Sequence, residues 1–151
     1  MSGGLADEVA PGATGLQQLQ ALIDQGRMPG IGTSLQFTLV EIDEGRAVFE
    51  GIPGPHAYNP IGSVHGGYAA TLLDSACGCA VHSKLSATQA YTTLELKVSY
   101  VRGMTSETGP VRAEATVVNM GRRVAFAEAR LTDAGGKVLA TASSTLLVID
   151  R

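Results

Sequence analysis

The stretch NPIGSVHGGYAATLLDSACGCAV, residues 59–81, decides the fold, and the rest of the chain can be read outward from it. It begins as a loop that ends in His-Gly-Gly at residues 65–67, and it continues as a long run of small and apolar residues. Across residues 51–83, Asp74 is the only Asp, Glu, Lys or Arg. An unpaired carboxylate is costly among apolar groups unless water, a partner or a proton compensates it. Asp74 is therefore a candidate functional residue.

A chain of 151 residues with 44% hydrophobic content is long enough to bury the core of one domain. We expect a flexible leader over residues 1–13, which are rich in Gly, Ala and Pro, and a single domain over residues 14–151. The formal net charge of -3 provides no basic field for nucleic acid or for an anionic membrane. The sequence shows no targeting signal and no uncharged apolar run of about 18 residues, so we expect a cytoplasmic protein.

The apolar residues of the central stretch repeat with the period of an α-helix from residue 66 to about residue 83. One face of this helix collects Ala69, Leu72, Leu73, Ala76, Cys77 and Ala80. Most other positions are also small or apolar, which is typical of a helix that is buried on all sides. At roughly 100° per residue, Asp74 lies about 125° from the centre of that face. We expect its side chain to point away from the main core.

The segment before the central stretch predicts a short helix followed by a β-hairpin. Thr14 and Gln17 have the spacing of a capping box and open an amphipathic helix. Further on, Leu35, Phe37 and Leu39 alternate with polar residues, and the alternation changes phase after Leu39, which indicates a strand with a β-bulge. A turn at residues 44–45 leads into a second strand over residues 46–52.

The segment after the central stretch predicts four strands in succession, over residues 91–102, 111–119, 122–133 and 137–149. The first of them has one predicted buried face, made of Leu94, Leu96, Val98 and Tyr100. We expect these strands to form a meander. The whole chain then predicts an α+β fold in which a curved antiparallel sheet wraps around the central helix. Open sheet edges invite pairing between subunits, so we also expect an oligomer.

Two glycines at the predicted start of the central helix leave backbone N–H groups uncovered at the positive end of the helix dipole, where an oxyanion can bind. A carbonyl oxygen on the Gly66 or Gly67 amide would make its carbon more electrophilic, as acyl transfer requires. Donors of this kind contribute roughly 2.7–4 kcal/mol in enzymes where they have been removed. The alternative is that the glycines only allow close packing of the helix against the sheet.

Asp74 favours the chemical interpretation, because it is a candidate general base or nucleophile. It could instead hydrogen-bond a Ser or Thr for structural reasons, or pair with an Arg from a strand. Gly67 and Asp74 are seven residues apart, about 10 Å along the helix axis, so one acyl carbon cannot touch both groups of one chain. Antiparallel helices of two subunits, related by a two-fold axis, would bring an amide and a carboxylate together. We therefore predict an obligate dimer as the catalytic unit.

The combined motifs resemble a known family. Asn59, His-Gly-Gly at residues 65–67, Asp74, TTLELKVSYVR at residues 92–102 and GRRVAFAEARLTDAGGKVLATASSTLLV at residues 121–148 resemble the hotdog-fold acyl-CoA thioesterases of the phenylacetate-pathway (PaaI-like) group. The resemblance covers residues 31–149. It implies hydrolysis of an acyl- or arylacyl-CoA to the free acid and CoA, with CoA as part of the substrate and with no metal or other cofactor. It also implies a homotetramer built as a dimer of dimers.

The resemblance implies roles for individual residues of the central stretch. The Gly66 amide, with Gly67 beside it, would polarise the thioester carbonyl, and Asn59 would orient the thioester or the attacking water. Asp74 from the partner subunit would be the nucleophile or the general base. His65 would fix the loop rather than act as a base.

The remaining implied roles lie after the central stretch. Thr93 would hold the water or the acid through its hydroxyl. The residues implied for CoA binding are Arg102, Gly121, Arg122, Arg123, Ser144 and Thr145. Arginine suits phosphate because it can pair with two oxygens at once. The sequence has Gly103 after Arg102 where many members of the family have proline, which changes the loop that would contact CoA.

Two other functions remain open on the sequence. A hotdog hydratase or dehydratase would act on the same thioester class, but it commonly pairs a histidine with the carboxylate, and no histidine has such a spacing from Asp74. A non-catalytic acyl-CoA-binding protein would leave Asp74 without a chemical role.

Overall fold

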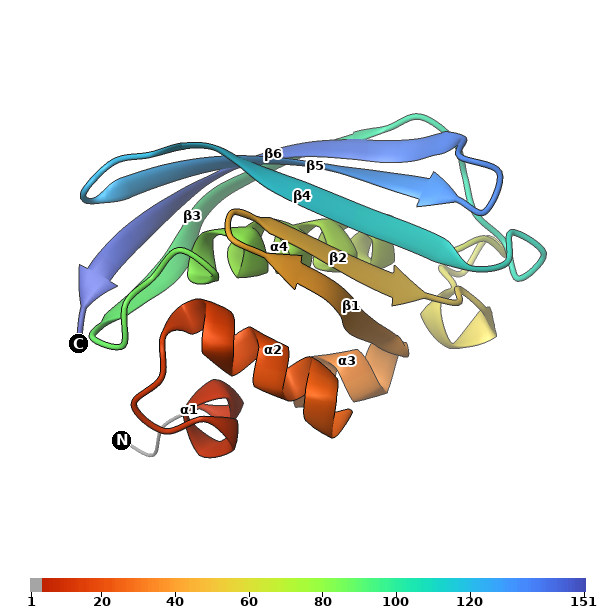
Figure 1. Ribbon diagram of the computed structural model, residues 1–151. Coiled ribbons are helices and arrows are strands. Elements are labelled where there is room, and N and C mark those ends of the chain that lie inside the picture. Colours follow the sequence, from red (N-terminus) through yellow and green to blue (C-terminus); the bar gives the residue numbers. More distant parts are fainter. Residues whose placement is uncertain (1–3) are drawn as a thin grey trace.

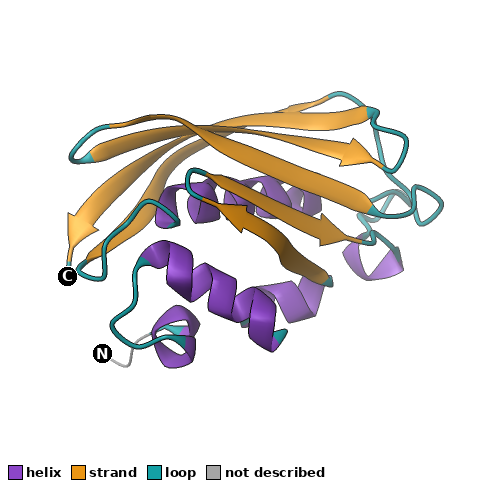
Figure 2. Cartoon of the chain, in the orientation of Figure 1, coloured by secondary structure: helices purple, strands orange, loops and turns teal. Residues whose placement is uncertain are grey.

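The long helix predicted from the central stretch is α4 (Gly66–His82), and a curved six-stranded sheet lies against it (Figure 1). The computed structural model describes residues 4–151 of the chain. Three shorter helices, α1 (Leu5–Val9), α2 (Gly15–Gln25) and α3 (Gly30–Leu35), precede the sheet, and a 3₁₀ turn forms at Pro55–Ala57. The view coloured by secondary structure shows α4 enclosed between the sheet and the N-terminal helices (Figure 2).

The strands are β1 (Phe37–Asp43), β2 (Arg46–Gly51), β3 (Gln89–Tyr100), β4 (Val111–Met120), β5 (Val124–Asp133) and β6 (Val138–Asp150). Neighbouring strands are antiparallel, and their order across the sheet is β1-β2-β4-β5-β6-β3. This arrangement confirms the predicted α+β fold with a curved antiparallel sheet around one helix. The sheet ends at β1 on one side and at β3 on the other within the described chain.

The N-terminal predictions are confirmed with one correction. Thr14 and Gln17 form a capping box at the start of α2, and the register of the hairpin shifts after Leu39, as the change of phase indicated. Leu35 was expected to belong to the first strand, but it ends α3. Gln36 lies between the end of α3 and the start of β1. Its left-handed backbone (φ 59°) separates the helix from the strand.

The predicted four-strand meander is wrong for its first strand. Only β4, β5 and β6 follow one another in the sheet, whereas β3 pairs with β6 and β4 pairs with β2. The segment 101–110 between β3 and β4 is long enough to cross to another part of the sheet, while the β4–β5 and β5–β6 connections are short turns. Alternation in a sequence identifies strands, but it does not identify their partners.

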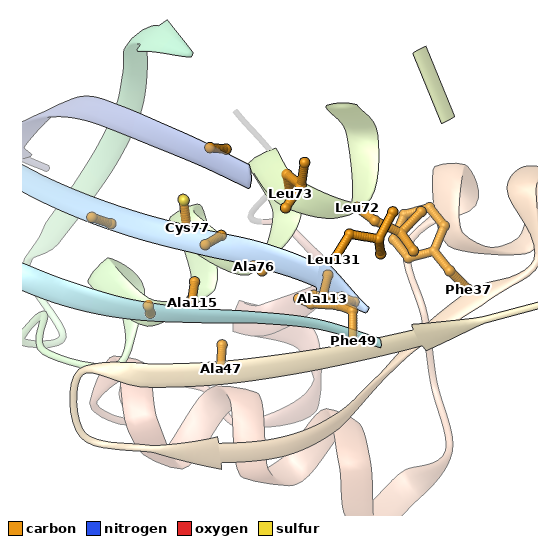
Figure 3. Close-up of a cluster of buried hydrophobic side chains, with 14 of the residues drawn as sticks. Phe37, Ala47, Phe49, Leu72, Leu73, Ala76, Cys77, Ala113, Ala115 and Leu131 are labelled. Carbon is orange, nitrogen blue, oxygen red and sulfur yellow. The ribbon is translucent and has the colours of Figure 1, made fainter. Parts of the chain in front are cut away.

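The core is built from close contact between α4 and small residues of the sheet. The expectation that α4 is buried on all sides is wrong, because Thr71 and Ser75 on the opposite side are partly exposed. Leu72, Leu73, Ala76 and Cys77 of α4 are all 0% exposed, which confirms the predicted buried face of the helix. They face strand positions occupied by alanine, among them Ala47, Ala113 and Ala115, with Phe37, Phe49 and Leu131 at one end (Figure 3). Alanines let the sheet approach the helix closely, and interiors packed in this way leave little room for a change of volume.

The predicted flexible leader over residues 1–13 contains the short helix α1 (Leu5–Val9), and residues 1–3 lie outside the described chain, so the flexibility of the segment stays a prediction. Asp7 accepts two hydrogen bonds of 2.8 Å from the guanidinium of Arg151. It also accepts one from Gln18, whose amide oxygen contacts His82 Nε2 at 2.9 Å. This network joins both termini to the end of α4. A five-residue helix is too short to show a period in the sequence.

His82 makes the stability of this network depend on pH. Burial, followed by the charge of Arg151, lowers the pKa of His82 below 6.5. The unfolded chain then binds a proton at a higher pH than the folded chain does, so the free energy of unfolding should fall as the pH drops below about 6.5 and stay level above it.

We predict that native protein loses more free energy of unfolding between pH 8 and pH 5.5 than His82→Gln does. Urea unfolding at the two pH values measures this, and His56 and His65 are present in both proteins. The same pH dependence in native protein and variant would contradict the assignment.

Candidate active site

The start of α4 is fixed by His65, which is the N-cap residue of the helix. Its Nδ1 accepts a hydrogen bond of 2.8 Å from the Gly67 amide, and its carbonyl accepts one of 3.0 Å from the Tyr68 amide. The ring therefore fixes the loop, as its predicted structural role requires. The Gly67 amide is not free for a substrate, because it already donates to this ring.

Gly66 is different, because its N–H group makes no hydrogen bond within residues 4–151. It is the first residue of a 17-residue helix, where the partial positive charge of the helix dipole is greatest. Of the two amides that the sequence singled out, only the Gly66 amide is left to bind an oxyanion.

Asn59 uses its side chain within its own loop. Its Oδ1 accepts from the amides of Ile61 and Ser63 at 3.1 and 3.2 Å, and its Nδ2 donates to the Ser63 hydroxyl at 3.1 Å. These contacts form a turn in which an Asn side chain replaces a backbone acceptor. They hold the loop in front of α4, and a direct contact of Asn59 with a substrate stays a prediction.

Asp74 is brought together with Thr93, as predicted. The Thr93 hydroxyl on β3 donates a hydrogen bond of 3.0 Å to Asp74 Oδ1, and Asp74 is half-buried. In the described part of the chain no Lys or Arg forms an ion pair with Asp74, which removes the arginine pair as an explanation. Within residues 4–151, the carboxylate has one neutral hydrogen-bond partner and no oppositely charged one. A catalytic carboxylate and a structural hydrogen bond to Thr93 both fit this contact.

The cysteines next to Asp74 do not compete with it as nucleophiles. Burial, and then the negative charge of Asp74, raise the pKa of Cys77 and of Cys79 to about 12. Thiols with such pKa values remain protonated near neutral pH, and the thiolate is the reactive form. Asp74 is therefore the candidate nucleophile or base of this part of α4, and the two thiols are not.

Gly66 and Asp74 are not brought together within one chain. They are eight positions apart on one helix, about 12 Å along its axis. Thr93 lies on β3, the strand whose outer side has no partner within the described chain. Each chain thus offers a free amide at one end of α4 and a carboxylate in its middle, both close to an open sheet edge.

The predicted CoA-binding residues divide into two groups. The Arg102 amide donates to the Leu139 carbonyl, and the Arg123 carbonyl accepts from the Val148 amide. Leu139 and Val148 are nine positions apart on β6. The two groups of predicted CoA-binding residues therefore lie about 30 Å from each other along the sheet. Arg122 and Gly121 belong to the second group, in the β4–β5 turn. One CoA phosphate cannot be held by both groups of the same chain.

Ser144 differs from the expectation. Its side chain is 3% exposed, and its hydroxyl donates to the Glu95 carbonyl at 2.9 Å, next to the bulge of β3. Thr145 contacts the Glu95 carboxylate at 3.4 Å. Ser144 therefore supports the pairing of two strands and is not open to CoA in this chain.

Tyr100 is a site residue that the sequence assigned only to the core. The register of β3 shifts between Thr93 and Glu95, so the extra residue, Leu94, is 58% exposed instead of buried. The shift places Thr93 and Tyr100 on the side of the strand that faces α4, where the Tyr100 hydroxyl donates to the Gly66 carbonyl at 2.7 Å. A bulge in an otherwise regular alternation leaves no clear signal in one sequence.

Two classes of feature were not found in residues 4–151. No group of three or more His, Cys, Asp and Glu side chains could hold a metal ion there. None of the helices in this range is long and apolar enough to span a membrane.

Comparisons with known proteins identify the family and the fold. Residues 61–140 match the family model described as Thioesterase superfamily. A Halobacterium salinarum protein named as a candidate esterase is 46% identical over 69 residues, which are 44% of this chain and 44% of that protein, less than half of its length. The 1,4-dihydroxy-2-naphthoyl-CoA hydrolase of Listeria monocytogenes is 22% identical over 119 residues, 79% of this chain and 95% of that protein.

Among solved structures, the PaaI protein of E. coli, from the phenylacetic acid degradation operon, is similar with a TM-score of 0.77 and 20% identity. The similarity covers 89% of this chain and 94% of that one. It confirms the predicted hotdog fold.

We predict that Asp74→Asn leaves the free energy of unfolding unchanged or raises it by up to about 1 kcal/mol, because it removes an uncompensated charge and keeps an acceptor for Thr93. Asp7→Asn is the matched control, and it should be destabilised because Asp7 pairs with Arg151. Urea unfolding at pH 7 measures both. A loss of more than about 1 kcal/mol in Asp74→Asn would indicate a purely structural pair with Thr93.

Proposed function

Because the chain belongs to the thioesterase superfamily, we propose that it hydrolyses an acyl- or arylacyl-CoA thioester to the free acid and CoA. The observation that carries the proposal is that α4 offers both a free Gly66 amide and a carboxylate, Asp74, which has the Thr93 hydroxyl as its partner and no cation within residues 4–151. The Listeria monocytogenes relative, named as a CoA hydrolase, supports the substrate class.

The chemistry follows from these two groups. The Gly66 amide donates to the thioester carbonyl oxygen, and negative charge develops on this oxygen as the carbonyl carbon is attacked. Asp74 either takes a proton from the attacking water or attacks the carbon itself and forms an anhydride that water then hydrolyses. In both routes the carbon–sulfur bond breaks and CoA leaves as the thiolate. The thiolate then takes up a proton. The Thr93 hydroxyl occupies Oδ1 of Asp74, which leaves Oδ2 for the reaction.

The catalytic unit in this proposal is a homodimer. Since Gly66 and Asp74 of one helix are about 12 Å apart, each site takes its amide from one subunit and its carboxylate from the partner subunit. The open edge of β3 is the surface for this pairing, and Leu94, Tyr100 and Val101 beside it are 57–58% exposed. Arg102 and the Arg122–Arg123 pair can then contact the same CoA phosphate only when they come from different subunits.

We further propose that two dimers form a homotetramer and that the protein works in the cytoplasm without a metal or redox cofactor. CoA enters this scheme only as part of the substrate.

A hydratase is less well supported, because the three histidines are engaged elsewhere. His65 caps α4, His82 contacts Gln18, and His56 contacts the Leu35 carbonyl at 3.1 Å. None of these contacts involves Asp74, so the described chain offers no histidine–carboxylate pair for chemistry at the α or β carbon. A non-catalytic acyl-CoA-binding protein would need no carboxylate held beside a hydroxyl at this position.

We predict that the protein releases free thiol from acyl-CoA substrates and that Asp74→Ala lowers kcat by at least about 10²-fold, the low end for a positioned acid or base. A thiol-trapping assay over short, long and aromatic acyl-CoAs measures both. The control is Asp24→Ala, which removes an exposed carboxylate on α2 and should keep native activity. Retained activity in Asp74→Ala would falsify the assignment of Asp74, and the absence of hydrolysis with every substrate would contradict the proposed function.

A further inference from the structure

Tyr100 lies directly beside the amide that the proposed function uses. We propose that Tyr100 is a positioning residue, which holds the first peptide groups of α4 so that the Gly66 N–H points at the thioester carbonyl. This proposal rests on the proposed thioester hydrolysis and adds a residue that acts on the reaction through Gly66.

The contacts at the helix start leave one donor free and fix its neighbours. The peptide between Gly66 and Gly67 is held at both ends, since its carbonyl accepts from the Tyr100 hydroxyl at 2.7 Å and its N–H donates to His65 Nδ1 at 2.8 Å. The carbonyl of the preceding peptide accepts from the Tyr68 amide at 3.0 Å. Of the four N–H and C=O groups of these two peptides, only the Gly66 N–H makes no hydrogen bond within residues 4–151. Its direction is therefore set by three hydrogen bonds, of which Tyr100 supplies one.

The ring of Tyr100 also explains why residue 66 is a glycine. A Cβ atom at this position would lie 3.1 Å from Cζ and from the hydroxyl oxygen of Tyr100, closer than ordinary van der Waals contact. The backbone of Gly66 thus lies directly against the ring. At 57% exposure the rest of the side chain is open, so Tyr100 stands at the surface next to the free amide and is not a core residue.

Such a residue acts on the rate of the chemical step. A hydrogen bond to the thioester oxygen strengthens as negative charge develops, so its geometry matters most in the transition state. When the 66–67 peptide loses one of its two anchors, the N–H can tilt away from the oxyanion, while most contacts that bind CoA and the acyl group remain. Loss of the Tyr100 hydroxyl should therefore lower kcat more than it changes KM.

The test compares Tyr100→Phe with native protein and with Tyr68→Phe. Tyr68 is the matched control, because its hydroxyl lies in the same helix turn, is buried and has no hydrogen-bond partner in the described chain. We expect Tyr100→Phe to lower kcat about tenfold, less than the 10²–10³-fold loss known for a direct oxyanion donor. KM should change less than about twofold, and Tyr68→Phe should keep the native values.

A spectroscopic measurement separates positioning from a general loss of folded protein. An acyl-CoA analogue with a methylene group in place of the thioester sulfur keeps the carbonyl and cannot be hydrolysed. Its carbonyl stretching frequency, measured by infrared difference spectroscopy on bound complexes, should fall on binding to native protein and to Tyr68→Phe. In Tyr100→Phe it should return toward the value of the free analogue.

An unchanged kcat and an unchanged carbonyl frequency in Tyr100→Phe would overturn the positioning role while leaving thioester hydrolysis intact. Absence of hydrolysis by native protein would overturn the proposed function, and the positioning role would fall with it.

Discussion

The structure depends on the close contact between α4 and the alanine-lined face of the sheet. Ala47, Ala113 and Ala115 bring the strands so near that only small or apolar residues fit on the helix, and the exceptions lie where the helix emerges from this contact. These exceptions include His82 at the end of the helix and Asp74, which turns toward the Thr93 hydroxyl. The start of the helix also lies outside this contact, and glycine there permits the approach of Tyr100. The packing that buries the helix thus also limits the proposed chemistry to the helix start and to Asp74.

A rigid helix keeps these two places apart. Eight residues of α-helix hold Gly66 and Asp74 about 12 Å from each other, and no side-chain movement closes that gap for an acyl carbon. The open edge of β3 carries Thr93 and Tyr100, one beside each group, so pairing of two such edges would carry the carboxylate of one chain toward the amide of the other. In the proposed function, the fold, the dimer and the reaction therefore depend on one geometric requirement.

Periodicity in the sequence was enough to predict α4, the bulge after Leu39 and the isolation of Asp74, because each follows from local spacing. Three features could not be predicted, each for its own physical reason. The partner of β3 depends on the path of a long connection, the exposure of Leu94 depends on a bulge inside an alternating strand, and the helix Leu5–Val9 is stabilised by the distant Arg151. At the site, spacing singled out Gly66 and Gly67 equally, and the difference between them comes from the ring of His65, which accepts the hydrogen bond of the Gly67 amide in the folded chain.

The central claim is that each active site takes its amide and its carboxylate from two chains, and a mixture of two inactive variants tests it most directly. Gly66→Pro removes the donor, since proline is tolerated at the first helical position and His65 already has a compatible extended backbone. Gly66→Ala is the control, because it keeps the N–H and adds the same Cβ atom beside the Tyr100 ring. Unfolding and refolding Gly66→Pro together with Asp74→Ala in equal amounts should restore roughly a quarter of the native activity, because half of the dimers then hold one complete site of two. No activity above that of the separate variants would contradict a shared site.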